Sequence, residues 1–275
     1  MTNPFSVNDI EILISTMNKT SLDFLELLFP FKHFSEFNIL IINQTIPTQI
    51  LVSNYKNITV INSFEKGLSK SRNLALENCS KKIALIADDD VVYCQGFDNE
   101  IIKYFNNDEN QAIITFNHQR IGNQKPQNSS INYYEHTLKT IDKVCSIEIA
   151  FQVAIIKKHQ LKFDEHFGLG ATFKTAEENL FLREALQKNL KMSFNPAVIV
   201  THPLITSGKK EGSDNLIFAR AALYYKTKGV YGYLTLLKHI YHLLKNKNIT
   251  FNESYDKLKI GLSGIKKFKK IQKII

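Results

Sequence analysis

Five short β-prone runs, separated by helix-forming segments, dominate the first 116 residues of this 275-residue chain. Most of their residues are isoleucine, leucine, valine or alanine, and polar side chains do not alternate regularly with apolar ones. A strand that is covered on both faces is apolar throughout, whereas a half-exposed strand alternates. The pattern therefore predicts an α/β fold with a mostly parallel sheet flanked by helices and with strands at 10–14, 38–42, 58–61, 83–87 and 112–116.

Helix signals fill the gaps between these runs. Thr20 resembles the N-cap of a helix that ends before Pro30, and residues 67–77 form the next helix. The rest of the chain is predicted to contain a loop at 121–131, a helix that begins at Glu177, a late strand at 197–200 and helices from 215 onward. We expect two domains, an α/β domain at 1–212 and a helical, basic extension at 213–275.

The composition is that of a globular protein. Hydrophobic residues make up 44% of the chain. The three cysteines are odd in number and irregular in spacing, so we expect buried thiols in a reducing cytosol. The first nine residues lack an apolar signal segment, and no run approaches the ~18 apolar residues of a spanning helix. The predicted location is cytoplasmic.

Positive charge is concentrated near the C-terminus. The chain carries a net charge of +9, and residues 238–275 hold ten lysines and two acids, or +8 (10 − 2). Lysines beside an apolar helical stripe are typical of a helix on an anionic membrane, here the inner face of the cytoplasmic membrane. Packing on the domain, with a soluble tail, is the alternative, and no motif indicates nucleic-acid binding. The stripe consists of Tyr233, Leu236, Leu237, Ile240, Leu243 and Leu244.

Three adjacent carboxylates, Asp88, Asp89 and Asp90, directly follow the run at 83–87. In open α/β sheets, ligands bind beyond the carboxyl ends of strands, which is where these residues lie. Like charges repel, so gathering them costs free energy unless a cation compensates. Carboxylate oxygens suit Mn²⁺ or Mg²⁺, which bridge carboxylates to substrate phosphates. The alternative is a solvated acidic turn.

Three further features are candidates for a site. The segment Gly67–Asn73 places a glycine, two hydroxyls and two cations at a helix start, which suits a diphosphate or an ordinary capped helix. Glu177 and Glu178 open a helix and supply either a general base or a favourable charge at the helix dipole. His202 ends a strand, where it is a third metal ligand, a diphosphate contact or a structural histidine.

The order of these motifs resembles that of family 2 glycosyltransferases with the GT-A fold, a Rossmann-like sheet. The resemblance covers about residues 10–202, and its most specific part is the pair Arg72-Asn73, followed about 15 residues later by the aspartates. It implies a nucleotide-binding half at about 1–116 and an acceptor half at about 117–212. The matching segments are Ile12–Asn18, Gly67–Asn73, Ile86–Asp90, Gly168–Gly170 and Glu177–Asn179.

The resemblance implies a nucleotide-sugar donor, often a UDP-sugar, and a divalent metal. Asp88 would face the ribose and, with Asp90 and His202, bind the metal. Strand two usually ends in an aspartate, whereas here it ends at Asn43-Gln44, which leaves the identity of the nucleotide open. The residues that would contact the nucleotide or diphosphate are Ser15, Thr16, Asn18, Asn43, Ser71, Arg72, Asp88 and Asp89.

On the acceptor side, the resemblance implies that Glu178 is the base, supported by Glu177, and that the product has inverted anomeric configuration. The family usually has Glu-Asp at this position, and its tryptophan-containing acceptor segments are missing here. The expected acceptor is a saccharide or a lipid-linked molecule in surface polysaccharide synthesis.

Two other functions fit part of the pattern. A nucleotidyltransferase on a similar sheet usually has a basic, glycine-rich loop after strand one, but Ser15–Lys19 contains no glycine. A catalytically inactive scaffold protein is disfavoured by the intact aspartates and the acidic pair. Pyrophosphate release would support the first alternative, and donor binding without transfer would support the second.

Overall fold

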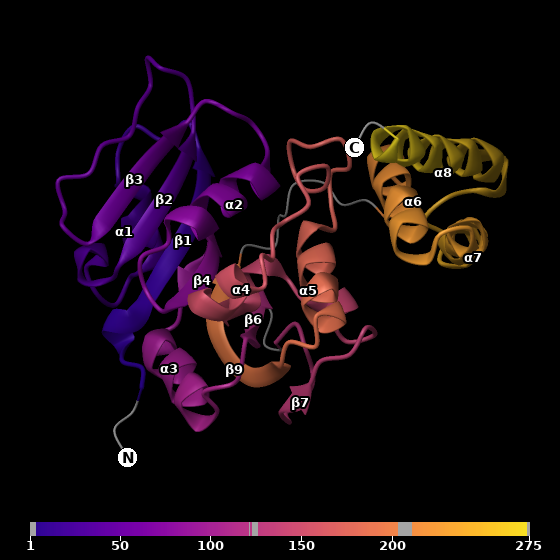
Figure 1. Ribbon diagram of the computed structural model, residues 1–275. Helices are drawn as coiled ribbons and strands as arrows, with labels where there is room; N and C mark the ends of the chain where they lie inside the picture. The colour runs from indigo at the N-terminus through magenta and orange to yellow at the C-terminus, as the bar shows by residue number, and fades with distance from the viewer. Residues whose placement is uncertain (1–3, 121, 123–125, 203–210, 274–275) are drawn as a thin grey trace. The chain divides into compact units, whose positions relative to one another are not determined.

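The computed structural model describes residues 4–120, 122, 126–202 and 211–273 (Figure 1). The chain forms two compact units, which are described separately. The first comprises Met1–Phe163 and Glu178–Leu204, and the second comprises Asp164–Glu177 and Ile205–Ile275.

A mixed sheet organises the first unit. Its strands are β1 (Ile10–Met17), β2 (Ile39–Gln44), β3 (Ile58–Ser63), β4 (Ile83–Asp88), β5 (Val92–Tyr93), β6 (Ile113–Arg120), β7 (Tyr134–Glu135), β8 (Ile149–Gln152) and β9 (Met192–His202). They lie in the order β3-β2-β1-β4-β8-β6-β9-β5, with β7 also paired to β9. The pairs β3–β2, β2–β1, β1–β4 and β6–β9 are parallel, which confirms the predicted mostly parallel sheet. β8 runs antiparallel to both of its neighbours and joins the two parallel parts.

Helices cover both faces of this sheet. They are α1 (Phe24–Leu28), α2 (Leu68–Asn78), α3 (Phe97–Asn107), α4 (Val153–Lys158) and α5 (Glu177–Gln187), with short 3₁₀ turns η1 (Val7–Asp9), η2 (Phe34–Glu36), η3 (Ile141–Lys143) and η4 (Ser146–Glu148). In β1, Ile12 and Ile14 pack toward α1 and α3, while Leu13 packs toward α2, α4 and α5. This two-sided burial explains why the strands are apolar throughout.

Two predicted elements have different bounds in the structure. The first helix is only Phe24–Leu28, and its N-cap residue is Asp23 rather than Thr20. The late strand expected at 197–200 is the end of the 11-residue β9. Its first half was missed because Ser193 and Asn195 interrupt the apolar pattern, although both side chains are buried. Residues 121 and 123–125 of the predicted loop lie outside the described residues.

Three helices build the second unit: α6 (Asp214–Lys228), α7 (Tyr231–Lys245) and α8 (Phe251–Gln272). α6 and α8 approach closely at Gly264, where an added Cβ would lie 2.2 Å from the backbone oxygen of Phe218. Phe167 and Phe173 pack against Phe268 of α8, with ring centroids 6.1 Å apart in each pair. These ring contacts group the segment 164–177 with the helices, whereas the boundary between residues 212 and 213 stays a prediction.

The apolar stripe of α7 mostly faces the core of the helical unit. Leu236, Ile240 and Leu243 are buried there, whereas Tyr233 and Leu237 are exposed. Of the two alternatives for this stripe, packing within the protein is therefore the one that holds for its buried members. None of the helices in the described parts of the chain is long and apolar enough to cross a membrane.

Candidate active site

Two of the three aspartates that follow β4 are paired with basic side chains of the same unit. Oδ1 of Asp88 lies 3.2 Å from Nη2 of Arg72, and Oδ2 of Asp89 lies 3.2 Å from Nζ of Lys19. Thr16 also donates its hydroxyl hydrogen to Asp89. Part of the repulsion among the carboxylates is therefore offset by the protein's own cations, a source that the sequence did not reveal.

The third aspartate, Asp90, contributes to a group that could hold a metal ion. One ligand atom from each of Asp88, Asp90 and His202 lies within 4.8 Å of the others. Nε2 of His202 is 3.4 Å from Oδ1 of Asp90, and this contact lowers the pKa of the Asp90 carboxyl. Two carboxylates and an imidazole are suitable ligands for Mn²⁺, and the carboxylates are suitable for Mg²⁺.

A short antiparallel pairing brings this group together. After Asp90 the chain enters β5, where Val92 lies opposite Thr201 of β9. This register holds the turn that carries Asp90 beside His202, the last residue of β9. Residues 112 positions apart in sequence thus meet at the carboxyl ends of β4 and β9.

The pair Arg72-Asn73 of α2 links the fold to the aspartates. Arg72 is 3% exposed, and its guanidinium also lies over the ring of Phe163, 5.7 Å from the centroid. Asn73 donates to the backbone oxygen of Phe163 (2.9 Å) and accepts from its backbone nitrogen (2.7 Å). Arg72 thus points toward Asp88 and orients its carboxylate. A direct contact between Arg72 and the nucleotide stays a prediction.

Several predicted nucleotide contacts hold the strand ends together. The Ser71 hydroxyl donates to that of Ser15 (2.9 Å). The amide of Asn43, which is fully buried, accepts from the backbone nitrogen of Lys19 and donates to its backbone oxygen, both at 3.0 Å. Asn18 has a φ of 53°, so the chain turns sharply after β1. These internal contacts shape the end of β1, and binding of a nucleotide by these residues stays a prediction.

The acidic pair begins α5, as the sequence predicts. Glu177 is buried, and Glu178 is partly exposed. Ala176, directly before the pair, has a φ of 75°, which residues other than glycine rarely adopt. Such backbone strain persists where the surrounding structure fixes it, often at functional sites.

Cys145 lies within electrostatic reach of both predicted parts of the site. Its burial and then the negative charges of Glu148, Glu178 and Asp88 raise the pKa of the Cys145 thiol to about 12. The thiol therefore stays protonated near neutral pH and is not a nucleophile. The carboxylates of Glu178 and Asp88 therefore both lie near enough to the Cys145 thiol for their charges to affect its pKa.

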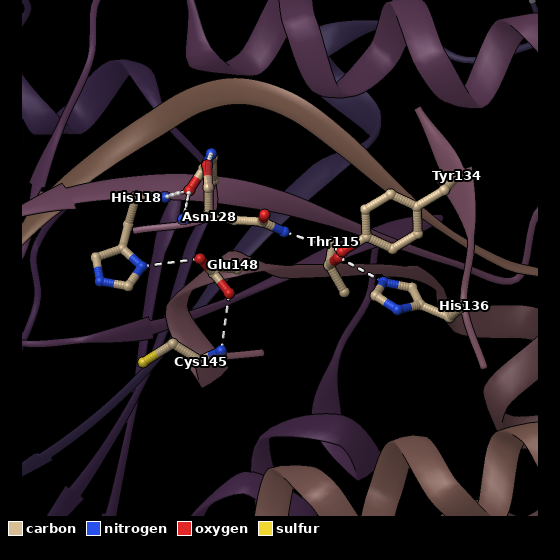
Figure 2. Close-up of polar contacts among 8 residues, drawn as sticks. Thr115, His118, Asn128, Tyr134, His136, Cys145 and Glu148 are labelled. Atoms are coloured by element: carbon tan, nitrogen blue, oxygen red, sulfur yellow. Dashed lines mark hydrogen bonds and ion pairs between the residues drawn. The ribbon is translucent and has the colours of Figure 1, made fainter. Parts of the chain in front are cut away.

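A buried pair that the sequence analysis missed lies beside Cys145. Figure 2 shows Nδ1 of His118 next to Oε1 of Glu148 (2.8 Å), while Oε2 of Glu148 accepts from the backbone nitrogen of Cys145 (2.8 Å). His118 and Glu148 are 5% and 3% exposed. The only available signal was an acid at the start of the apolar segment 148–156. The pair fixes η4 beneath the site.

The strand order β3-β2-β1-β4 and the acidic group at the carboxyl end of β4 fit a GT-A-like fold, which the solved structures described below share. The sequence matches the family described as "Glycosyl transferase family 2" over residues 25–190. The chain belongs to this family, and it is therefore a glycosyltransferase that uses a nucleotide-sugar donor.

Solved structures of S. aureus TarS share the fold. TarS 1–349 has a TM-score of 0.57 at 13% identity, over 93% of this chain and 80% of that one. The complex of TarS 1–349 with UDP-GlcNAc has a TM-score of 0.61 at 14% identity, and the match covers 94% of this chain and 80% of TarS 1–349. For the longer TarS structure the TM-score is 0.59 at 15% identity, and the match covers 93% of this chain but 49% of TarS. No curated protein sequence matches the chain.

The Asn73 amide should be important for stability. In Asn73→Ala, the backbone nitrogen and oxygen of Phe163 lose buried partners, at about 1–3 kcal/mol for each unsatisfied group. We expect the free energy of unfolding in guanidinium to fall by about 2–6 kcal/mol. Asn78→Ala, an exposed change on the same helix, is the control. Equal stabilities of the two variants would contradict this assignment.

Proposed function

We propose that this protein transfers a sugar from a UDP-sugar to a hydroxyl group of a saccharide or lipid-linked acceptor, with inversion of the anomeric carbon, in surface polysaccharide synthesis. The observation that carries the proposal is the convergence of Asp88, Asp90 and His202 within 4.8 Å. The structural likeness to TarS, which has been crystallised with UDP-GlcNAc, supports a uridine nucleotide.

We propose Asp88, Asp90 and His202 as ligands for Mn²⁺ or Mg²⁺. A divalent cation bound there would neutralise negative charge that develops on the departing diphosphate. The ion pair with Arg72 holds the Asp88 carboxylate in position beside Asp90 and His202. Asp90 is half-exposed, so it is accessible to an ion from solvent.

On the acceptor side, Glu178 is proposed as the general base. A carboxylate that takes a proton from the acceptor hydroxyl strengthens the attacking oxygen as the donor bond breaks. Glu178 is partly exposed, whereas Glu177 is buried, which favours Glu178 as the residue that meets the acceptor. Attack from the face opposite the diphosphate inverts the anomeric carbon.

The C-terminal helices are proposed to contact an anionic membrane through a face of α7 that shares only Leu237 with the predicted stripe. Val230, Leu234, Leu237 and Tyr241 recur at helical spacing and are 51–69% exposed. Exposed lysines at 238 and 245 flank this face. Apolar side chains beside lysines are suited to the boundary between lipid headgroups and acyl chains.

Asp90→Ala tests the metal site. It removes a proposed ligand, so we expect UDP affinity in the presence of Mn²⁺ to fall by at least about tenfold (about 1.4 kcal/mol). In calorimetric titrations with UDP, a chelator should weaken wild-type binding to a similar extent and affect the variant little. Asp256→Ala, which changes an exposed carboxylate on α8, is the control. Unchanged Mn²⁺-dependent affinity in Asp90→Ala would exclude this site.

Glu178→Gln tests the base. The amide keeps the size of the side chain but cannot accept the proton, so we expect kcat to fall by about 10²–10⁴ while UDP affinity is retained. Transfer is measured as UDP release from UDP-sugars with a panel of oligosaccharide acceptors. Glu184→Gln, on the same helix and partly exposed, is the control. Normal transfer by Glu178→Gln would show that another group is the base.

Leu234→Asp and Tyr241→Asp test the membrane face. Each places a charge on the proposed lipid-contacting surface, so we expect sedimentation with phosphatidylglycerol-containing vesicles to fall severalfold. Leu27→Asp, at a residue of α1 that is 72% exposed, should behave like the wild type. A role for this face would be excluded if the wild type does not bind the vesicles. It would also be excluded if Leu234→Asp and Tyr241→Asp bind them as well as the control Leu27→Asp does.

A further inference from the structure

A cavity of about 310 Å³ lies in the first unit, and Asp88, Asp89 and Asp90 are not among the residues that line it. It is formed by the C-terminal end of α3, the first residues of β6 and β9, and the chain just before β7. α3 and β7 both lie toward the lower edge of Figure 1. Small-molecule sites in proteins usually measure roughly 300–1,000 Å³, so the cavity is large enough for a small ligand.

An unsatisfied buried amide lines this cavity. Asn195 of β9 is 1% exposed, and its Oδ1 accepts from the backbone nitrogen of Ala197 at 2.8 Å. This bond fixes the orientation of the amide, so Nδ2 is the atom left to donate. Nδ2 is buried and has no hydrogen-bond partner among the described residues. An unsatisfied buried donor is destabilising, and an acceptor group of a ligand would provide the missing hydrogen bond.

The other polar groups of the cavity are held in place. Nε2 of Gln111 donates to Oγ of Ser193 at 2.7 Å, and both side chains are buried. Asp108 pairs with Lys191 at 2.6 Å, and this contact lowers the pKa of the Asp108 carboxyl. Asp108 is therefore an ionised acceptor near neutral pH, with its charge balanced by Lys191. Hydroxyl-bearing neutral ligands fit this set better than anions do.

Two aromatic rings complete the lining. Tyr104 of α3 is partly exposed, and Tyr133, before β7, is 52% exposed. Aromatic rings offer flat apolar surface to the C–H face of a ligand, while amide and carboxylate groups bond its hydroxyls. A sugar ring has both an apolar C–H face and a rim of hydroxyls.

We propose that this cavity binds one sugar unit of a glycan, with Nδ2 of Asn195 donating to a sugar oxygen and Asp108 accepting from a hydroxyl. The assignment of that glycan as acceptor or product rests on the proposed function. Asn195 precedes His202 by seven residues in β9, so at about 3.3 Å per residue the two are separated by roughly 20 Å along the strand. The cavity would therefore hold a unit several sugars away from the reacting one.

Binding of free monosaccharides tests this proposal directly. Glucose, galactose and N-acetylglucosamine are titrated by saturation-transfer NMR against the full chain, with UDP and Mn²⁺ present to occupy the donor site. We expect at least one sugar to bind, and Tyr133→Ala and Asn195→Leu to weaken it by about tenfold or more. Tyr255→Ala, at a tyrosine of α8 that is 65% exposed, should bind like the wild type.

Tyr133 is half-exposed, so its variant remains informative even if Asn195→Leu fails to fold. The proposal is overturned if none of the three sugars binds, or if Tyr133→Ala binds them as the wild type does. UDP titrations of the same samples separate this result from the proposed function. Retained UDP binding with no sugar binding rejects only the cavity, whereas lost UDP binding with retained sugar binding rejects the donor site.

Discussion

Repulsion among three consecutive carboxylates is the constraint that organises this molecule. Each carboxylate has a different partner: Arg72 for Asp88, Lys19 for Asp89 and His202 for Asp90. The partners come from α2, the segment after β1 and the end of β9. All three carboxylates therefore have their partners only where these elements lie close together. Asp88 and Asp90 differ from Asp89 because they alone share the group with His202. The pairing thus separates Asp89, which is held by Lys19 and Thr16, from Asp88 and Asp90, which share with His202 a group that could hold an ion.

The same helix that neutralises Asp88 also stabilises the fold. Arg72 and Asn73 are adjacent and both buried, one bonded to an aspartate and the other to the backbone of Phe163. A change that shifts α2 would therefore move a proposed metal ligand as well as loosen the core. This double role gives a physical reason why an arginine-asparagine pair precedes the aspartates in the chain, beyond any direct contact with a nucleotide.

Local patterns predicted the parallel part of the sheet and the proximity of Asp88, Asp90 and His202, because both depend on strand ends. Runs such as 83–87 show burial on two faces, and Asp88, Asp90 and His202 all lie at carboxyl ends of strands. Other features depend on long-range partners that no local pattern encodes. Glu148 was missed because its partner His118 is 30 residues away. The surroundings of Leu236 stayed open between a membrane and the protein core because an apolar stripe does not reveal what covers it.

We propose that a divalent cation binds between the ends of β4 and β9, where it would contact the donor's diphosphate. Anomalous diffraction at the manganese edge, from crystals grown with UDP and Mn²⁺, tests it most directly. We expect one strong peak within coordination distance of Asp88, Asp90 and His202, about 2.0–2.2 Å from carboxylate oxygens, and in contact with the diphosphate. Bound UDP with no peak there, or with manganese held by other residues, would contradict the account.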